Sequence, residues 1–142
     1  MPPLAAQVNV CDRWAKDKTE NLQAAYFNGA GFESWENVWG TWNGITPRDG
    51  EAIRRVGAIL RFFGGADGGA LLLSPEWEPH SPEVQQFGTV FGSKFTGNTS
   101  ALFTLVNRKG ADAAGVQLVL EPSKNAHFYD CMRGTELKLG PV

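Results

Sequence analysis

Cysteine, histidine and long apolar runs are scarce in this chain. Its 142 residues include two cysteines, Cys11 and Cys131, and two histidines, His80 and His127. Two distant cysteines match neither a zinc-ligand spacing nor a disulfide-dense scaffold, and the two imidazoles have no cluster of acids around them. We therefore expect no metal and no other cofactor. No segment approaches the roughly 20 apolar residues that a membrane span requires.

Signatures of nucleotide-binding and serine-hydrolase sites are missing as well. The glycine-rich segment Gly64–Gly69 follows a predicted helix instead of opening one, and it lacks the Lys-Ser or Lys-Thr ending of a phosphate loop. No Gly-x-Ser-x-Gly nucleophile turn occurs. The formal net charge is −2 and the basic residues are scattered, so neither nucleic acid nor a membrane surface is expected as a partner.

The cellular location is left open. The first residues, Met1 to Ala6, carry no positive leader and no apolar run of signal-peptide length. Asn98-Thr99-Ser100 fits the acceptor motif for N-glycosylation, which is frequent by chance. These observations allow an extracellular location without indicating one, and they leave a bridge between Cys11 and Cys131 undecided.

The composition is that of a folded protein. Hydrophobic residues make up 42% of the chain and charged residues 20%, which is enough apolar material for a core. The length suits one ordinary domain or two small units, and it is too short for a whole (β/α)₈ barrel of roughly 250 residues.

The clearest local signal predicts a helix from Pro47 to Phe62. Thr46 supplies a capping hydroxyl, Pro47 suits the first helical position, and Asp49 places an acid in the first turn. Apolar residues then recur at helical spacing up to Gly64-Gly65, which should stop the helix; they are Ile53, Val56, Leu60 and Phe63.

Shorter elements are predicted before this helix. Val8-Asn9-Val10 favours a short strand, and residues 12–23 are polar enough for a surface loop or helix. The aromatic run Ala24–Phe27 predicts a short buried strand that enters a glycine turn. Between Phe32 and Gly44, three of the five tryptophans share one helical face, which predicts a short aromatic helix: the positions are Trp35, Val38, Trp39 and Trp42.

The second half is predicted to be mainly antiparallel β-structure. Gly64–Ala70 is predicted to be a flexible connection, and Trp77 is expected to pin the linker that contains it. The resulting division is a barrel-like segment at 1–63, a linker at 64–86 and a β domain at 87–142. Turn chemistry separates five short strands, expected near Gly88–Phe95, Ala101–Asn107, Val116–Leu120, Ala126–Cys131 and Glu136–Leu139.

Two stretches of the first half and three of the second carry a resemblance to a known family. They are Ala25–Gly40, Ile45–Arg48 running into Glu51–Arg55, Ser93-Lys94-Phe95, Leu105–Arg108, and Phe128–Asp130 with Gly134–Leu137. Together they resemble glycoside-hydrolase-like proteins that join a (β/α)₈ barrel to a C-terminal β-sandwich, sometimes beside a formylglycine-generating-enzyme-like domain on the same chain.

The resemblance implies an α+β chain in which the terminal strand and helix of a partial (β/α) barrel precede a small antiparallel β-sandwich or meander. It implies the C-terminal fragment of a glycosidase-like protein, catalytically incomplete alone. Its expected partners are a glycan and the remaining barrel of a longer parent chain, with the aromatic segment at the sugar-facing rim.

The candidate site residues lie in and beside the aromatic segment. Glu33 and Glu36 are the candidate carboxylates, but on a helix both would project from one surface, so we expect a single catalytic or hydroxyl-binding acid instead of an acid and nucleophile pair. Hydrogen-bonded loop acids are the alternative. The candidate sugar-binding residues, for which turn or core roles are the alternative, are Asn28, Trp35, Asn37, Trp39 and Trp42.

A second hypothesis is a non-enzymatic module that binds carbohydrate or another protein. In that version the β-sandwich is complete, the Pro47 helix packs against it, and the three clustered tryptophans form its core. Such a chain should be a stable monomer, whereas a barrel fragment should expose strand edges that promote association.

Overall fold

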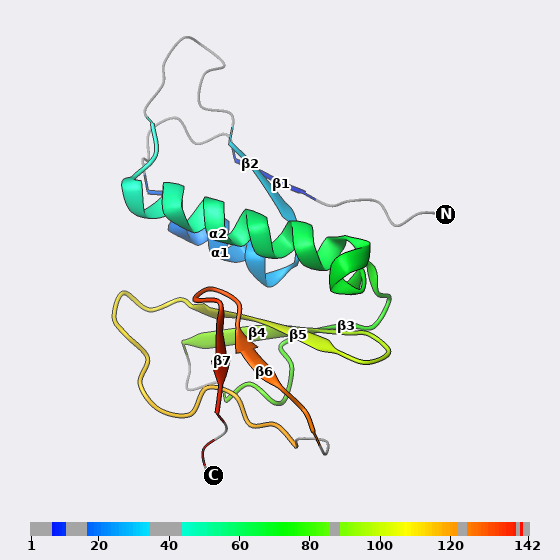
Figure 1. Cartoon of the computed structure of the whole chain (residues 1–142). Helices are drawn as coiled ribbons and strands as arrows, with labels where there is room; N and C mark the ends of the chain where they lie inside the picture. The colour runs from blue at the N-terminus through cyan, green and yellow to red at the C-terminus, as the bar shows by residue number, and fades with distance from the viewer. Residues whose placement is uncertain are drawn as a thin grey trace.

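The computed structural model of the chain describes residues 7–10, 17–34, 44–85, 89–121, 125–138 and 140, with backbone alone for 7–10 and for Ser34. Two α-helices, two short 3₁₀ turns and three small sheets make up this part (Figure 1). The predicted α+β class is therefore confirmed. In chain order the elements are β1 (Gln7–Val10), α1 (Thr19–Phe27), β2 (Gly31–Ser34), α2 (Pro47–Gly64), η1 (Ala66–Gly68), η2 (Leu71–Leu73), β3 (Trp77–Pro79), β4 (Val90–Thr96), β5 (Ala101–Asn107), β6 (Phe128–Asp130) and β7 (Thr135–Leu137).

The first half forms a strand–helix–strand–helix unit. Strands β1 and β2 pair in parallel, in a register that runs from Gln7 opposite Gly31 to Val10 opposite Ser34. Parallel neighbours need a crossover connection, and here α1 supplies it. Helix α2 then follows β2, so each of the two parallel strands precedes a helix.

The predicted buried strand at Ala24–Phe27 is wrong, because these residues form the last turn of α1. Alanine is the strongest helix former, and Leu22, Ala25 and Tyr26 stand at the i, i+3, i+4 spacing of one helical face. All three are buried in the structure. The strand predicted around Val8–Val10 is confirmed as β1.

The first residues of the segment predicted to be an aromatic helix form a strand instead. Phe32, Glu33 and Ser34 belong to strand β2, because they hydrogen-bond in parallel to β1. The rest of the aromatic segment, residues 35–43, lies outside the described residues.

Helix α2 confirms the prediction for Pro47–Phe62 and extends it to Gly64. The Thr46 hydroxyl accepts a hydrogen bond from the Asp49 backbone N–H at 3.1 Å, which satisfies one of the unpaired donors at the helix start. Val56 and Ile59 are the buried apolar positions of the helix, so α2 packs through one face.

The connection after α2 is folded, contrary to the predicted flexible segment at Gly64–Ala70. Gly68 is buried against the backbone of Phe62 and Phe63 at the end of α2, and Leu71 is only 1% exposed, packed with Phe95 and Leu102. Leu71 thus anchors the connection by burial of a large apolar side chain. Trp77, in β3, stacks on Phe95 with ring centroids 6.2 Å apart. The domain limits at residues 63 and 87 stay a prediction.

The second half holds a three-stranded antiparallel sheet and a separate hairpin. Strands β3, β4 and β5 are neighbours in that order, and β6 pairs with β7. Four predicted strands correspond to β4, β5, β6 and β7 within a few residues. The strand predicted at Val116–Leu120 is wrong, since Leu118 makes only an isolated bridge to Val84.

The two helices lie between the β1–β2 pair and the β3–β4–β5 sheet (Figure 1). Tyr26, Val56 and Ile59 from the helices meet Val106 of β5 in one buried cluster. A polar contact reinforces this packing, because the Thr104 hydroxyl donates to the Phe27 carbonyl at 3.1 Å. The helical half and the sheet therefore share a core.

Candidate functional site

The two parallel strands direct attention to their carboxyl edge. Parallel strands end at the same edge of a sheet, and in strand–helix proteins the loops at that edge carry the functional groups. Here the segments after β1 and β2 lead into α1 and α2, so both helices begin at this edge. Residues near Thr19 and Pro47 are thereby brought close together although 28 positions separate them.

Glu33 lies at this edge. It is the third of the four residues of β2 and stands opposite Asn9 in the parallel register. Its side chain is half-buried. The structure thus places one of the two candidate carboxylates where a parallel sheet positions functional groups.

The other candidate residues are not brought to Glu33 by the described structure. Asn28 follows the last residue of α1, at the amino end of β2, and its side-chain amide donates to the Ala24 carbonyl at 2.8 Å. It therefore caps the end of α1, near the amino end of β2 and away from the carboxyl edge. The remaining candidates lie outside the described residues; they are Trp35, Glu36, Asn37, Trp39 and Trp42.

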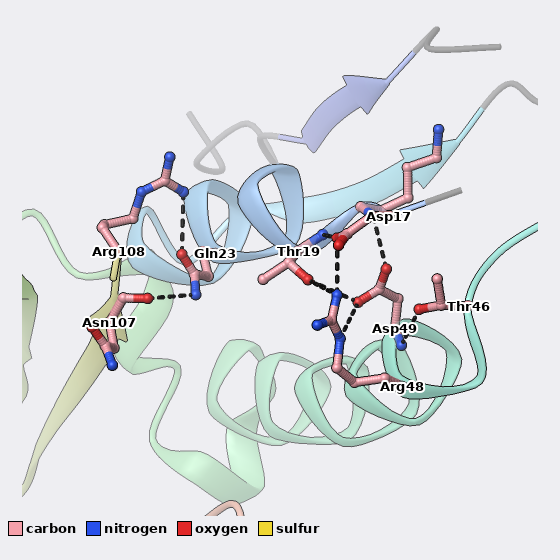
Figure 2. A network of polar contacts seen from close by, with 9 residues as sticks. Asp17, Thr19, Gln23, Thr46, Arg48, Asp49, Asn107 and Arg108 are labelled. Atoms are coloured by element: carbon pink, nitrogen blue, oxygen red, sulfur yellow. Dashed lines mark hydrogen bonds and ion pairs between the residues drawn. The ribbon is translucent and has the colours of Figure 1, made fainter. Parts of the chain in front are cut away.

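Asp49 is the centre of a polar network at the carboxyl edge (Figure 2). This carboxylate is 1% exposed. Its Oδ2 accepts the Lys18 backbone N–H at 2.7 Å, and its Oδ1 accepts the Thr19 hydroxyl at 3.1 Å. Because Lys18 and Thr19 begin α1 while Asp49 stands in the first turn of α2, the carboxylate ties the starts of the two helices together.

Arg48 closes the network from the solvent side. Its Nε lies 3.2 Å from Asp49 Oδ1, its Nη2 lies 2.9 Å from Asp17 Oδ1, and it also donates to the Thr19 hydroxyl. Asp17 in turn accepts the Thr19 backbone N–H at 2.9 Å. The chain entering α1 is therefore held by two carboxylates and one guanidinium.

The carboxylates of this network are held in their charged form. Hydrogen bonds from Thr19 and Arg48 lower the pKa of Asp17 to about 2. Burial by itself would raise the pKa of Asp49, but hydrogen bonds from Lys18, Thr46, Thr19 and Arg48 outweigh it and hold that pKa below the ordinary 3.8. Both oxygens of Asp49 are engaged by protein donors, so this residue holds the two helix starts together.

Acid should therefore weaken the fold through Asp49. A carboxyl whose pKa is lower in the folded than in the unfolded chain stabilises the fold above its unfolded pKa, and this stability is lost as pH falls through the folded pKa. We expect the free energy of unfolding to decline below about pH 4. Urea denaturation from pH 7 to pH 2.5 measures it. An Asp49→Asn variant should show a shallower decline, and an unchanged slope would contradict the assignment.

Sequence reasoning recognised Asp49 only as an acid in the first turn of a helix. The missed feature is its contact with a segment 31 positions earlier in the chain. A local signal for that partner exists in Asp17-Lys18-Thr19-Glu20, where an acid two residues before Thr19 accepts its N–H and a further acid occupies the first turn. No comparable signal indicates that the two helix starts meet.

Comparison of the chain with protein-family models, with curated proteins and with solved structures finds no match. Over residues 17–34, 44–85, 89–121 and 125–138, no group of three histidine, cysteine or acidic side chains could hold a metal ion. In that part of the chain, no helix is both long and apolar enough to cross a bilayer.

Proposed function

We propose that this chain is the C-terminal part of a glycoside-hydrolase-like protein, in which β1-α1-β2-α2 supplies two successive strand–helix units of a (β/α)₈ barrel. The observation that carries the proposal is the parallel pairing of β1 with β2 around α1, with Glu33 one residue from the carboxyl end of β2. In such barrels, catalytic groups come from the carboxyl ends of the strands. Glu33 is then a rim carboxylate facing a sugar.

The small size of the parallel sheet supports the incomplete-barrel part of the proposal. Parallel sheets occur almost only with both faces covered, and sheets commonly have four to six strands. Among the described residues, no third strand pairs with β1 or β2. The helices lie on one side of this pair (Figure 1). The partner that fits is a set of further parallel strands, which the remaining barrel of a longer parent chain would supply.

The chemistry assigned to Glu33 is that of one carboxylate in a pair. Glycoside hydrolysis usually needs two carboxyl groups, roughly 5 to 9.5 Å apart, on opposite sides of the scissile bond. Among the described residues, Asp49 is the first acid that follows β2 in the sequence. Both of its oxygens are engaged by protein donors. In this proposal the second carboxylate belongs to the remaining barrel, and the chain alone should bind sugar without hydrolysing it. Trp35, Trp39 and Trp42 are the stacking residues implied by the resemblance.

Glycan binding by the purified chain tests the proposal. We expect the wild type to bind a subset of a glycan array, and we expect Glu33→Gln to weaken the affinity for the best ligand about tenfold, because a hydrogen bond to a charged acceptor contributes roughly 1.5–3 kcal/mol. Isothermal titration calorimetry measures the change. Replacing Trp35, Trp39 and Trp42 together by alanine should abolish binding.

Glu78→Gln is the matched control, because Glu78 is an exposed acid on β3, in the other half of the molecule. Its variant should bind as the wild type does. Circular dichroism must show that every variant is folded. A folded wild type that binds no glycan, or a Glu33→Gln variant of unchanged affinity, would count against a sugar-facing Glu33 and favour the protein-interaction module.

A further inference from the structure

Exposed aromatic and apolar side chains gather where α2 faces the β6–β7 hairpin. Phe62 is 49% exposed, Tyr129 61% and Met132 38%. They come from segments more than 60 positions apart, so the fold and not the local sequence assembles them. Clustered apolar exposure of this kind is typical of a surface that binds another molecule.

A groove runs between these two elements. It consists of two adjoining hollows of about 350 and 390 Å³ that share Ala58 and Ile59 on one wall and Cys131 and Gly134 on the other. The hairpin wall contacts the helical half in two ways: Arg55 Nη1 donates to the Met132 carbonyl at 3.1 Å, and Cys131 packs against the buried cluster that contains Ile59.

One end of the groove is cationic. Arg54, Arg55 and Arg133 line it, and the carboxylates that form ion pairs with them are Glu51 and Asp130. Three guanidinium groups thus stand against two acids, in a chain whose net charge is −2. Glu51 takes two donors of Arg54 and one of Arg55, and the Arg133–Asp130 ion pair is long, at 3.5 Å. Each guanidinium has five N–H donors, so several remain to bind a carboxylate.

The other end is apolar and aromatic. Phe62 packs edge-on against Phe63, with ring centroids 5.0 Å apart, and Tyr129 faces them across the groove. Cys131 lines the hairpin wall here. Burial, with a smaller effect of the Asp130 carboxylate, raises the pKa of the Cys131 thiol, so the sulfur is uncharged and behaves as a small apolar group.

The spacing of the two ends sets the length of a ligand. Arg54 and Phe62 are eight positions apart on α2, which corresponds to about 12 Å at 1.5 Å per helical residue. An extended peptide covers about 3.3 Å per residue, so three to four residues span that distance. An acid at one end of such a segment would meet the arginines while an aromatic or leucine side chain entered the apolar end.

We propose that this groove binds an extended peptide in which an acidic residue stands three or four positions from an aromatic residue or leucine. Charge complementarity selects the acid, and burial against Phe62 and Tyr129 supplies most of the affinity. The hairpin lies beyond the helices from β1 and β2 (Figure 1), so the groove stays open when further strands join those two. The inference is therefore independent of the proposed glycosidase relationship.

Fluorescence anisotropy with labelled twelve-residue peptides tests it. The probes carry Glu-x-x-Phe, Glu-x-x-x-Phe or Glu-x-x-x-Leu in otherwise neutral sequences, and scrambled peptides of the same composition are the controls. We expect micromolar binding that weakens with added salt and is at least tenfold weaker for scrambled peptides. Phe62→Ala and Arg133→Ala should each weaken it about tenfold. Both residues are exposed, so the variants should fold, as circular dichroism would verify.

Arg61→Ala is the matched control, since Arg61 is an exposed arginine of the same helix outside the groove lining, and its variant should bind as the wild type does. The proposal is overturned if no probe binds at about 1 mM, or if Phe62→Ala and Arg133→Ala leave the affinity unchanged. It is equally overturned if sedimentation shows a wild-type dimer that Phe62→Ala converts to a monomer, because the occupant would then be a second copy of the chain.

Discussion

Replacing Asp49 with alanine should lower the free energy of unfolding by about 3 kcal/mol. The carboxylate is 1% exposed and accepts from the Lys18 N–H, the Thr19 hydroxyl and the Arg48 guanidinium. Alanine would leave the buried Lys18 N–H without an acceptor, and removing one partner of a buried charged contact typically costs about 3–5 kcal/mol. Because Arg48 is mostly exposed, the lower end of that range is appropriate. Urea denaturation at pH 7 measures the change.

Glu51→Ala is the matched control for this experiment. Glu51 lies two positions later in α2 and bonds Arg54 and Arg55, but it is exposed, so its loss should change stability far less than the loss of Asp49. Asp49→Asn keeps the shape and one acceptor oxygen, and it should fall between the two. Equal stabilities of the Asp49→Ala and Glu51→Ala variants would show that Asp49 does not tie the helix starts together.

How well the sequence predicts each helix or strand depends on how far apart in the chain the residues lie that stabilise it. Thr46, Pro47 and Asp49 specify the start of α2 within four positions, so the sequence predicts this helix correctly. The strand prediction for Ala24–Phe27 is wrong because it rests on the β-forming side chains of Tyr26 and Phe27, whereas Tyr26 is buried and Phe27 partly buried in a core that supports a helix. Val116–Leu120 has a strand-like sequence, but a strand needs a neighbour, and only Val84 bridges to it.

The residues of the candidate site likewise differ in how far the sequence predicts their positions. The sequence places Glu33 in a segment predicted to be an aromatic helix, whereas the structure puts it in a parallel strand, near the carboxyl end of that strand. The Asp49 network joins residues about 30 positions apart, so no periodicity or spacing could predict it. The groove between α2 and the hairpin depends on even more distant contacts, such as that of Arg55 with Met132.

Replacing Gly29 with alanine should destabilise the protein by about 3 kcal/mol, for two separable reasons. Gly29 turns the chain from α1 into β2 with a φ of +62°, a conformation that costs an alanine about 1 kcal/mol or more. A Cβ there would also stand 2.8 Å from Phe95 Cζ and 2.9 Å from Leu72 Cδ2. Phe95 is 2% exposed in the core, so it has little room to move, and overpacking of this kind costs roughly 1–3 kcal/mol.

Gly69→Ala separates the two contributions. Gly69 has a similar φ of +72°, but nothing lies within 4 Å of its hypothetical Cβ, so its variant should lose only the backbone contribution of about 1 kcal/mol. Thermal and urea unfolding of both variants give the difference, which is the cost of the clash with Phe95 and Leu72. If the two variants are equally stable, Phe95 and Leu72 move to accommodate the new methyl group. The turn that leads into β2 and Glu33 would then not be held in place by packing against the β-sheet.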